Sequence, residues 1–194
     1  MKIEKKVISN LNKCYAMSEL TWQGEHRFLV AAEKHDPCYV FAEDGAQLHT
    51  VWTEPGGVMT MTPVPGADGQ FLATHQFYSP NDSANAKIVI ATAKKKGDWE
   101  IRTLCEAPFV HRFGILNRNG TNYLLVCCLK SDHEYKNDWR FPGACYASVL
   151  PADLSVFNED HQLTLEPIME DMLRNHGYSK VCIEGYEAGV VGCE

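Results

Sequence analysis

The fold is decided by residues 117–127, Asn117-Arg118-Asn119-Gly120-Thr121-Asn122-Tyr123-Leu124-Leu125-Val126-Cys127. A polar turn that contains glycine leads here into a strongly apolar run. Such a run, bounded by turn residues, is typical of a β-strand in a sheet interior. Together with the short strand expected at residues 112–116, it predicts a hairpin. A single hairpin is common in proteins, so its recurrence along the chain carries the argument.

Three further segments share this plan of a short strand, a glycine turn and an apolar strand. Their turns are Gln23-Gly24-Glu25, Ala67-Asp68-Gly69 and Glu184-Gly185. The four turn glycines, Gly24, Gly69, Gly120 and Gly185, are 45, 51 and 65 residues apart. Units of four short strands recur every ~40–50 residues, which the first two spacings fit. The third is longer because residues 130–141 and 150–160 resemble loop insertions.

Each unit continues with a loop and a second pair of strands. The expected pairs are 38–41 with 48–52, 88–91 with 99–103, and 145–150 with 163–166. This is the strand plan of a propeller blade. The sequence therefore predicts an all-β chain, a partial or truncated β-propeller of about three and a half four-stranded blades. Residues 166–174 have the apolar spacing of a helical turn, and are alternatively the link into the fourth unit.

We expect one incomplete domain over residues 1–194. Blade 1 covers about 8–55, blade 2 about 56–108, blade 3 about 109–172, and the first half of blade 4 about 173–194. An open propeller leaves an apolar face and a bare sheet edge. We therefore expect either the N-terminal part of a longer protein or self-association through the open blade edge. Truncation is the preferred interpretation, since joining two copies requires their cut strands to match in register.

Composition excludes several classes of partner. The net charge of -7, without a block of basic residues, argues against nucleic acid. Residues 1–6 lack the apolar run of a secretory signal, and no run reaches the ~18 residues of a membrane span. We thus expect no membrane partner and a cytoplasmic location. The eight cysteines are then reduced, and no Cys-x-x-Cys pair indicates a zinc ribbon.

At its turns the chain resembles the FG-GAP/VCBS class of propeller repeats. The pattern Asn117-x-Asn119-Gly120-x-x-x-Leu124 is similar to the loop of that class, and Ala67-Asp68-Gly69 is a fainter form. Calcium requires several carboxylate oxygens in one loop, and these turns offer too few. We assign no calcium site.

A narrower similarity is to the propeller of sugar lyases of the aldos-2-ulose dehydratase type. Val110-His111-Arg112-Phe113 and Asn175-His176-Gly177-Tyr178 resemble blades of those enzymes that open with a histidine directed to the axis. The first two units carry Lys13 and Gly57 near the matching places. The resemblance implies carbohydrate as substrate and an elimination as reaction.

The candidate catalytic residues are His111, His176 and His75. In a propeller, the starts of innermost strands and the loops after second strands meet at one mouth of the channel. Imidazole suits zinc, manganese or iron, so we expect His111 and His176 as ligands of a divalent transition metal. The competing interpretation of each histidine is a surface or hydrogen-bonded side chain.

The candidate substrate-binding residues occupy the same expected mouth. Arg112 and Lys130 would bind an anionic group, and aromatic Trp139 would pack on a sugar ring. For these three, a solvated cation or a packed ring is the alternative. The full set is Arg112, Lys130, His133, Trp139, Glu33 and His35.

The leading hypothesis is a propeller that binds a carbohydrate or similar polar small molecule at its axial mouth, in one form as a metal-assisted lyase or isomerase. The alternatives are a non-catalytic scaffold for another protein and an inactive fragment. No Gly-x-Ser-x-Gly elbow, P-loop or dinucleotide glycine pattern is present, which excludes those nucleophile and nucleotide sites. We expect no nucleotide cofactor.

Overall fold

The computed structural model describes residues 3–194 and consists of antiparallel sheets joined by turns and loops. The first sheet has the order β1-β2-β3-β4 and the second β5-β6-β7-β8, with a short 3₁₀ turn, η1, between β7 and β8. Their bounds are β1 Cys14–Trp22, β2 Glu25–Ala32, β3 Cys38–Ala42, β4 Gln47–Trp52, β5 Met61–Pro63, β6 Gln70–His75, β7 Lys87–Ala93, η1 Lys95–Gly97 and β8 Trp99–Glu106.

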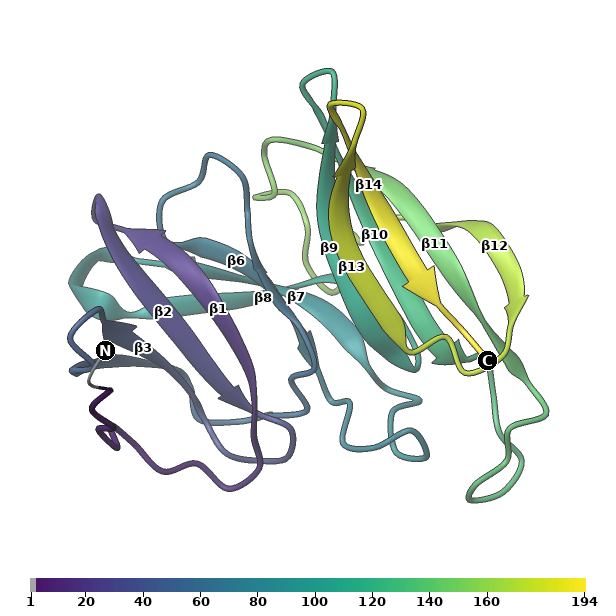
Figure 1. Cartoon of the computed structure of the whole chain (residues 1–194), viewed down its shortest axis with the longest axis horizontal. Coiled ribbons are helices and arrows are strands. Elements are labelled where there is room, and N and C mark those ends of the chain that lie inside the picture. The colour runs from purple at the N-terminus through teal and green to yellow at the C-terminus, as the bar shows by residue number, and fades with distance from the viewer. Residues whose placement is uncertain (1–2) are drawn as a thin grey trace.

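The third sheet has the order β9-β10-β11-β12, and β13-β14 form a separate hairpin. Figure 1 shows the first two sheets in one half of the molecule and the third sheet with the hairpin in the other. The bounds are β9 Val110–Arg118, β10 Thr121–Lys130, β11 Pro142–Leu150, β12 Glu166–Met172, β13 Gly177–Ile183 and β14 Tyr186–Gly192.

Three of the glycine turns have one geometry. In Gln23-Gly24, Asn119-Gly120 and Glu184-Gly185 both residues have positive φ, between 51° and 84°. Two-residue turns of this kind match the right-handed twist of the strands that they join, and glycine adopts positive φ without steric cost. The turn of the second unit differs: its glycines at 66 and 69 have positive φ, and β5 is only three residues long. The hairpins expected from the sequence are confirmed.

The sheets stack face to face, and three clusters of buried residues fill the layers between them. One cluster joins the first and second sheets, one the second and third, and one the third sheet and the hairpin. Adjacent residues of one strand pack into different layers, because side chains alternate between the two faces of the sheet. Phe71 of β6 packs toward the first sheet and Leu72 toward the third. In β10, Val126 faces the second sheet and Cys127 the hairpin.

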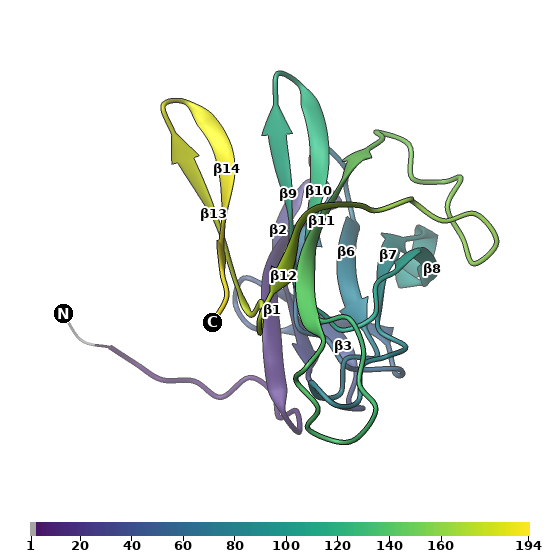
Figure 2. The ribbon, with the colours of Figure 1, turned by 90° about the vertical axis from the view of Figure 1, so that its right-hand side faces the viewer.

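This radial stacking is the architecture of a β-propeller with three four-stranded blades and a fourth represented by two strands. Figure 2 shows the hairpin as its own layer beside the sheet that contains β9 and β10. The outward side of the hairpin keeps Ile183, Tyr186 and Val190 more than half exposed. Within the described residues, no helix has the length and apolar character needed to cross a bilayer.

The fourth strand of the third sheet differs from the sequence expectation. We expected residues 163–166 to pair with β11 and residues 166–174 to form a helical turn or a link. Instead Glu166–Met172 is the edge strand β12, and residues 151–165 form the loop before it. The side chains of Ile168 and Met169 are about half exposed, at 52% and 51%. Their spacing therefore did not mark a buried helix face. Pairing with β11 instead provides the hydrogen bonds of the β12 backbone.

Candidate functional site

The first strands of all four units meet at the centre of the molecule. β1 contacts β5, and β9 contacts both strands of the hairpin. The Thr60 hydroxyl, just before β5, donates to the His111 carbonyl of β9 across 3.2 Å. Between these strands is a hollow of about 460 Å³, which we call the axial groove. It is lined by Tyr15, Ala16, Met17, Met59, Thr60, Met61, Arg112, Phe113, Tyr178, Ser179 and Lys180.

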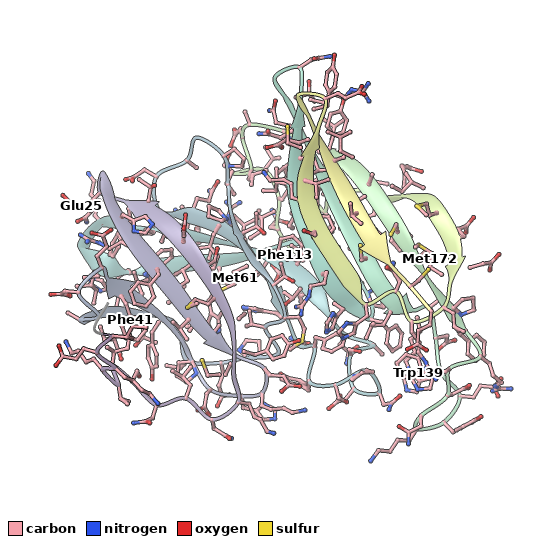
Figure 3. All side chains as sticks on the ribbon, viewed as in Figure 1. Glu25, Phe41, Met61, Phe113, Trp139 and Met172 are labelled. Atoms are coloured by element: carbon pink, nitrogen blue, oxygen red, sulfur yellow. The ribbon has the colours of Figure 1, made fainter. Side chains whose placement is uncertain are left out.

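Figure 3 labels two residues of this lining, Met61 of β5 and Phe113 of β9. The groove carries three hydroxyl groups, from Tyr15, Thr60 and Ser179, beside apolar surface from its methionines, whereas the Tyr178 hydroxyl is buried. The arrangement offers hydrogen bonds and apolar contact to a polar small molecule, which is typical of ligand sites.

Arg112 is the sequence-predicted residue that the structure places in this groove. Its side chain is half-buried, and its guanidinium donates hydrogen bonds to the Met59 carbonyl and to the Tyr15 hydroxyl, the latter across 3.0 Å. The guanidinium also lies 5.4 Å from the centre of the Tyr15 ring. These contacts fix the guanidinium at the wall of the groove and leave three of its five N–H donors free of them.

Two β-bulges lie in the strands that form this region. In the β1–β2 pair, Cys14 is opposite Ala32 and Ala16 is opposite Ala31, so Tyr15 is an extra residue. In the β9–β10 pair, Arg112 is opposite Cys127 and Val110 is opposite Cys128, so His111 is extra. A bulge bends its strand and redirects a side chain. Both extra residues lie near the start of an innermost strand, beside the axial groove.

His111 and His176 are brought together. Their rings lie 4.0 Å apart, centre to centre, and His111 Nδ1 is 3.3 Å from the His176 carbonyl oxygen. Burial, together with the charge of Arg112, lowers the pKa of His111 to about 3. Neutral imidazole is the form that ligates metals. As a proton acceptor it is weak, since general bases work best with a pKa near the operating pH.

His75 lies elsewhere, at the end of β6. Its ring packs edge-on against Trp52 at 4.5 Å, in the layer between the first two sheets. Burial is the main reason that its pKa is lowered to about 3. It lines a separate hollow of about 240 Å³ with Glu54, Lys87 and Glu159 among others. The structure therefore does not place His75 in the lining of the axial groove.

Lys130 is buried at the end of β10, where it contacts both the second and the third units. Its side chain is 1% exposed, and its amine donates to Asn81 Oδ1 at 2.9 Å and to the Asp138 carbonyl at 3.1 Å. The amine also lies 4.8 Å from the centre of the Trp139 ring. Burial lowers the pKa of Lys130, opposed by nearby carboxylates. These contacts anchor the inserted loop, residues 131–141, to the end of β10.

Trp139 and His176 share a second hollow of about 470 Å³, at the end of the third and fourth units. Arg174 lies over the Trp139 ring at 5.3 Å and pairs with Glu194. His133 packs edge-on against Phe109 at 5.5 Å. Trp139 therefore lines a hollow separate from the axial groove.

Glu33 and His35 follow β2. The Glu33 amide donates to the Lys13 carbonyl at 2.8 Å, and the His35 ring lies 4.6 Å from the Tyr78 ring. Both therefore take part in contacts that hold the loop after β2. Among residues 3–194, no group of three or more His, Cys, Asp or Glu side chains is placed to hold a metal ion.

Sequence reasoning missed Tyr15, Tyr178 and Lys180. Burial is the largest cause that raises the pKa of Tyr178 to about 12, and its ring lies against Gly114, where a Cβ atom would come within 2.1 Å of the Tyr178 hydroxyl oxygen. A signal was available for Tyr178, which follows His176 by two residues at the start of a unit. Tyr15 occupies the start of the first unit and could have been found by the same comparison of repeat positions.

Neither a protein-family profile nor a curated protein sequence matches the chain. Among solved structures, hydrazine synthase of Kuenenia stuttgartiensis is similar with a TM-score of 0.54 and 10% identity, over 90% of this chain and 48% of that chain. An arabinoxylan arabinofuranohydrolase of glycoside hydrolase family 43 from Bacillus subtilis aligns with a TM-score of 0.44 and 12% identity, over 92% of this chain and 46% of that one.

The chain thus spans about half the length of each of these two structures. The similarity to the first of them shows the fold alone. The resemblances to FG-GAP/VCBS repeats and to sugar lyases stay predictions from sequence. What the structure itself establishes is an all-β propeller whose four units share one axial groove.

Proposed function

We propose that the axial groove binds a carbohydrate or a similar polar small molecule. The observation that carries this proposal is the convergence of the innermost strands of all four units on one hollow. Its volume of about 460 Å³ lies within the ~300–1,000 Å³ that is common for small-molecule sites. The hydroxyls of Tyr15, Thr60 and Ser179 and the Arg112 guanidinium match the hydroxyl groups of a sugar, and the Tyr15 ring supplies aromatic surface.

The test is a binding screen against neutral and acidic mono- and disaccharides by titration calorimetry and ligand-observed NMR. A blocking variant, Ser179→Trp, adds a large ring in the groove at an exposed position of β13. The matched control is Thr164→Trp, at an exposed position in the loop before β12. Binding that Ser179→Trp weakens by ~10-fold or more, and that Thr164→Trp retains, supports the groove. Absence of binding to every sugar of the panel overturns the proposal.

An enzymatic form of the proposal uses His111 and His176. A divalent zinc, manganese or iron ion held by the two imidazoles would polarise a carbonyl or hydroxyl of the sugar in a lyase or isomerase reaction. The 4.0 Å separation of the rings is the observation that favours it. Further ligands would have to come from the substrate or from water.

Metal analysis separates the enzyme from the binding protein. One equivalent of a transition metal, lost in the double variant His111→Ala/His176→Ala, supports the enzyme. A folded protein that binds sugar equally well after treatment with a chelator contradicts it. The double variant must retain its circular dichroism spectrum, because His111 is buried against Phe77.

A further inference from the structure

The axial groove has the opposite charge to the chain that forms it. The whole protein has 25 acidic and 18 basic residues, for a net charge of -7. The residues that line the groove include two cations, Arg112 and Lys180, and neither Asp nor Glu. In a chain with an excess of carboxylates, a hollow without one presents a local positive potential.

Arg112 has no acidic partner among the described residues. The ion pairs of residues 3–194 include Arg102, Arg140 and Arg174 but not Arg112. Its two hydrogen bonds go to neutral groups, the Met59 carbonyl and the Tyr15 hydroxyl. A half-buried cation has lost part of its hydration. For Arg112, no ion pair within the described residues compensates this loss. An anion bound at the three remaining N–H donors would supply that counter-charge.

Lys180 is differently placed. Its amine pairs with Glu187 at 3.0 Å, where the two side chains are 49% and 34% exposed. Glu187 also accepts from the Asn117 amide. The charge of Lys180 is therefore already matched, and Arg112 is the uncompensated cation of the groove. Because Glu187 already matches its charge, Lys180 adds only a secondary attraction for an anion.

The geometry points to a sugar acid as the ligand of the axial groove: we propose that Arg112 binds its carboxylate. A guanidinium presents parallel donors that match the two oxygens of a carboxylate, which a lysine amine does not. The hydroxyls of Tyr15, Thr60 and Ser179 then face the sugar ring. This inference rests on the proposed function and narrows it from polar small molecules to carboxylate-bearing sugars.

The experiment compares ligands that differ only in the acid group. Glucuronate is titrated against glucose and galacturonate against galactose by calorimetry, with glucose 6-phosphate as a second anion. The expected result is binding of each uronate at least ~10-fold tighter than of its neutral sugar, since hydrogen bonds to charged groups are worth roughly a factor of ten or more. The uronate should also bind more tightly than the sugar phosphate.

Variants assign the preference to Arg112. Arg112→Gln should bind acid and neutral sugars alike. Arg112→Lys keeps the positive charge but lacks the parallel N–H donors of a guanidinium, so it should retain a reduced preference for the sugar acid. The matched control is Arg118→Gln, which removes an exposed arginine that lies over Tyr186 outside the groove lining and should keep the full preference. If Arg112→Gln does not fold, the ligand comparison on the wild type and Arg112→Lys still decides.

The outcomes are distinct. Equal binding of uronates and neutral sugars overturns the carboxylate assignment and leaves the proposed function standing. Tighter binding of the phosphate than of the uronates also overturns it. A preference that Arg118→Gln abolishes and Arg112→Gln keeps overturns the role of Arg112. Failure of every sugar to bind removes the proposed function and this inference together.

Discussion

The Arg112 guanidinium donates to the Tyr15 hydroxyl across 3.0 Å, although the two residues are 97 positions apart in the chain. The bond joins the innermost strands of the first and third units over the second. Both residues belong to the lining of the axial groove. Tyr15 reaches this position as the extra residue of a β-bulge. The bond therefore holds two innermost strands together and is also part of the candidate binding surface.

Tyr15→Phe removes this hydroxyl and keeps the ring beneath the guanidinium. We expect a loss of about 0.5–1.5 kcal/mol in the free energy of unfolding, the usual net value of one hydrogen bond. Urea unfolding followed by tryptophan fluorescence measures it. Tyr135→Phe, in the exposed loop at residues 131–141, is the matched control. Equal effects of the two changes would show that the bond to Arg112 does not contribute to stability.

Stability should fall with pH below about 6.5 because of His75 and His111. Both have a folded-state pKa of about 3, against 6.5 as the ordinary value. Between these values the unfolded chain binds protons that the folded chain does not. Their contribution is complete above pH 6.5 and is lost as pH falls toward 3, with a slope of up to about 1.4 kcal/mol per pH unit for each group.

The measurement is the urea midpoint between pH 6.5 and 5, where carboxylates titrate little. His75→Gln and His111→Gln should each flatten the slope, and the double variant should flatten it further. A wild-type slope that persists in the double variant would assign the pH dependence to other groups.

Gly114→Ala should loosen the C-terminal hairpin. A Cβ atom at this position of β9 would lie 2.1 Å from the Tyr178 hydroxyl oxygen, so the Tyr178 ring must move. Overpacking of this kind costs about 1–3 kcal/mol. Hydrogen exchange should rise in residues 177–192. The control Gly192→Ala adds a Cβ whose nearest neighbour, the Gly177 Cα atom, is 3.8 Å away, and it should leave exchange unchanged. Equal exchange in the two variants would mean that the hairpin does not depend on this contact.

Lys130→Ala should destabilise the third unit. The change leaves a cavity and removes the donor to Asn81 and to the Asp138 carbonyl, for a cost of about 2–4 kcal/mol. Thermal and urea unfolding measure it. Lys136→Ala, at an exposed position of the same loop, should change stability by less than about 0.5 kcal/mol. A stable Lys130→Ala protein with weakened sugar binding would instead support the substrate-binding role predicted from sequence.

The strand plan could be predicted because it depends on local patterns. Glycine at positions 24, 120 and 185 follows the requirement for positive φ in a two-residue turn. Apolar runs such as Tyr123–Cys127 follow from sheets covered on both faces. β12 was misplaced because edge strands carry a weak pattern: most of its side chains are exposed.

The candidate site was predicted only in part. His111 and His176 do meet, because equivalent positions of neighbouring units lie side by side in a propeller. Arg112 does line the groove. The burial of Lys130 and the place of His75 in another layer could not be seen, since both depend on which face of a strand meets the next sheet.

The sequence by itself determined the hairpins and the all-β class, because turn geometry and alternating burial are properties of a few neighbouring residues. Only the tertiary structure decided which side chains line the axial groove. Two bulges, at Tyr15 and His111, shift the register of the innermost strands by one residue, and such a shift redirects every side chain that follows. The contact of Arg112 with Tyr15 arises from that long-range packing.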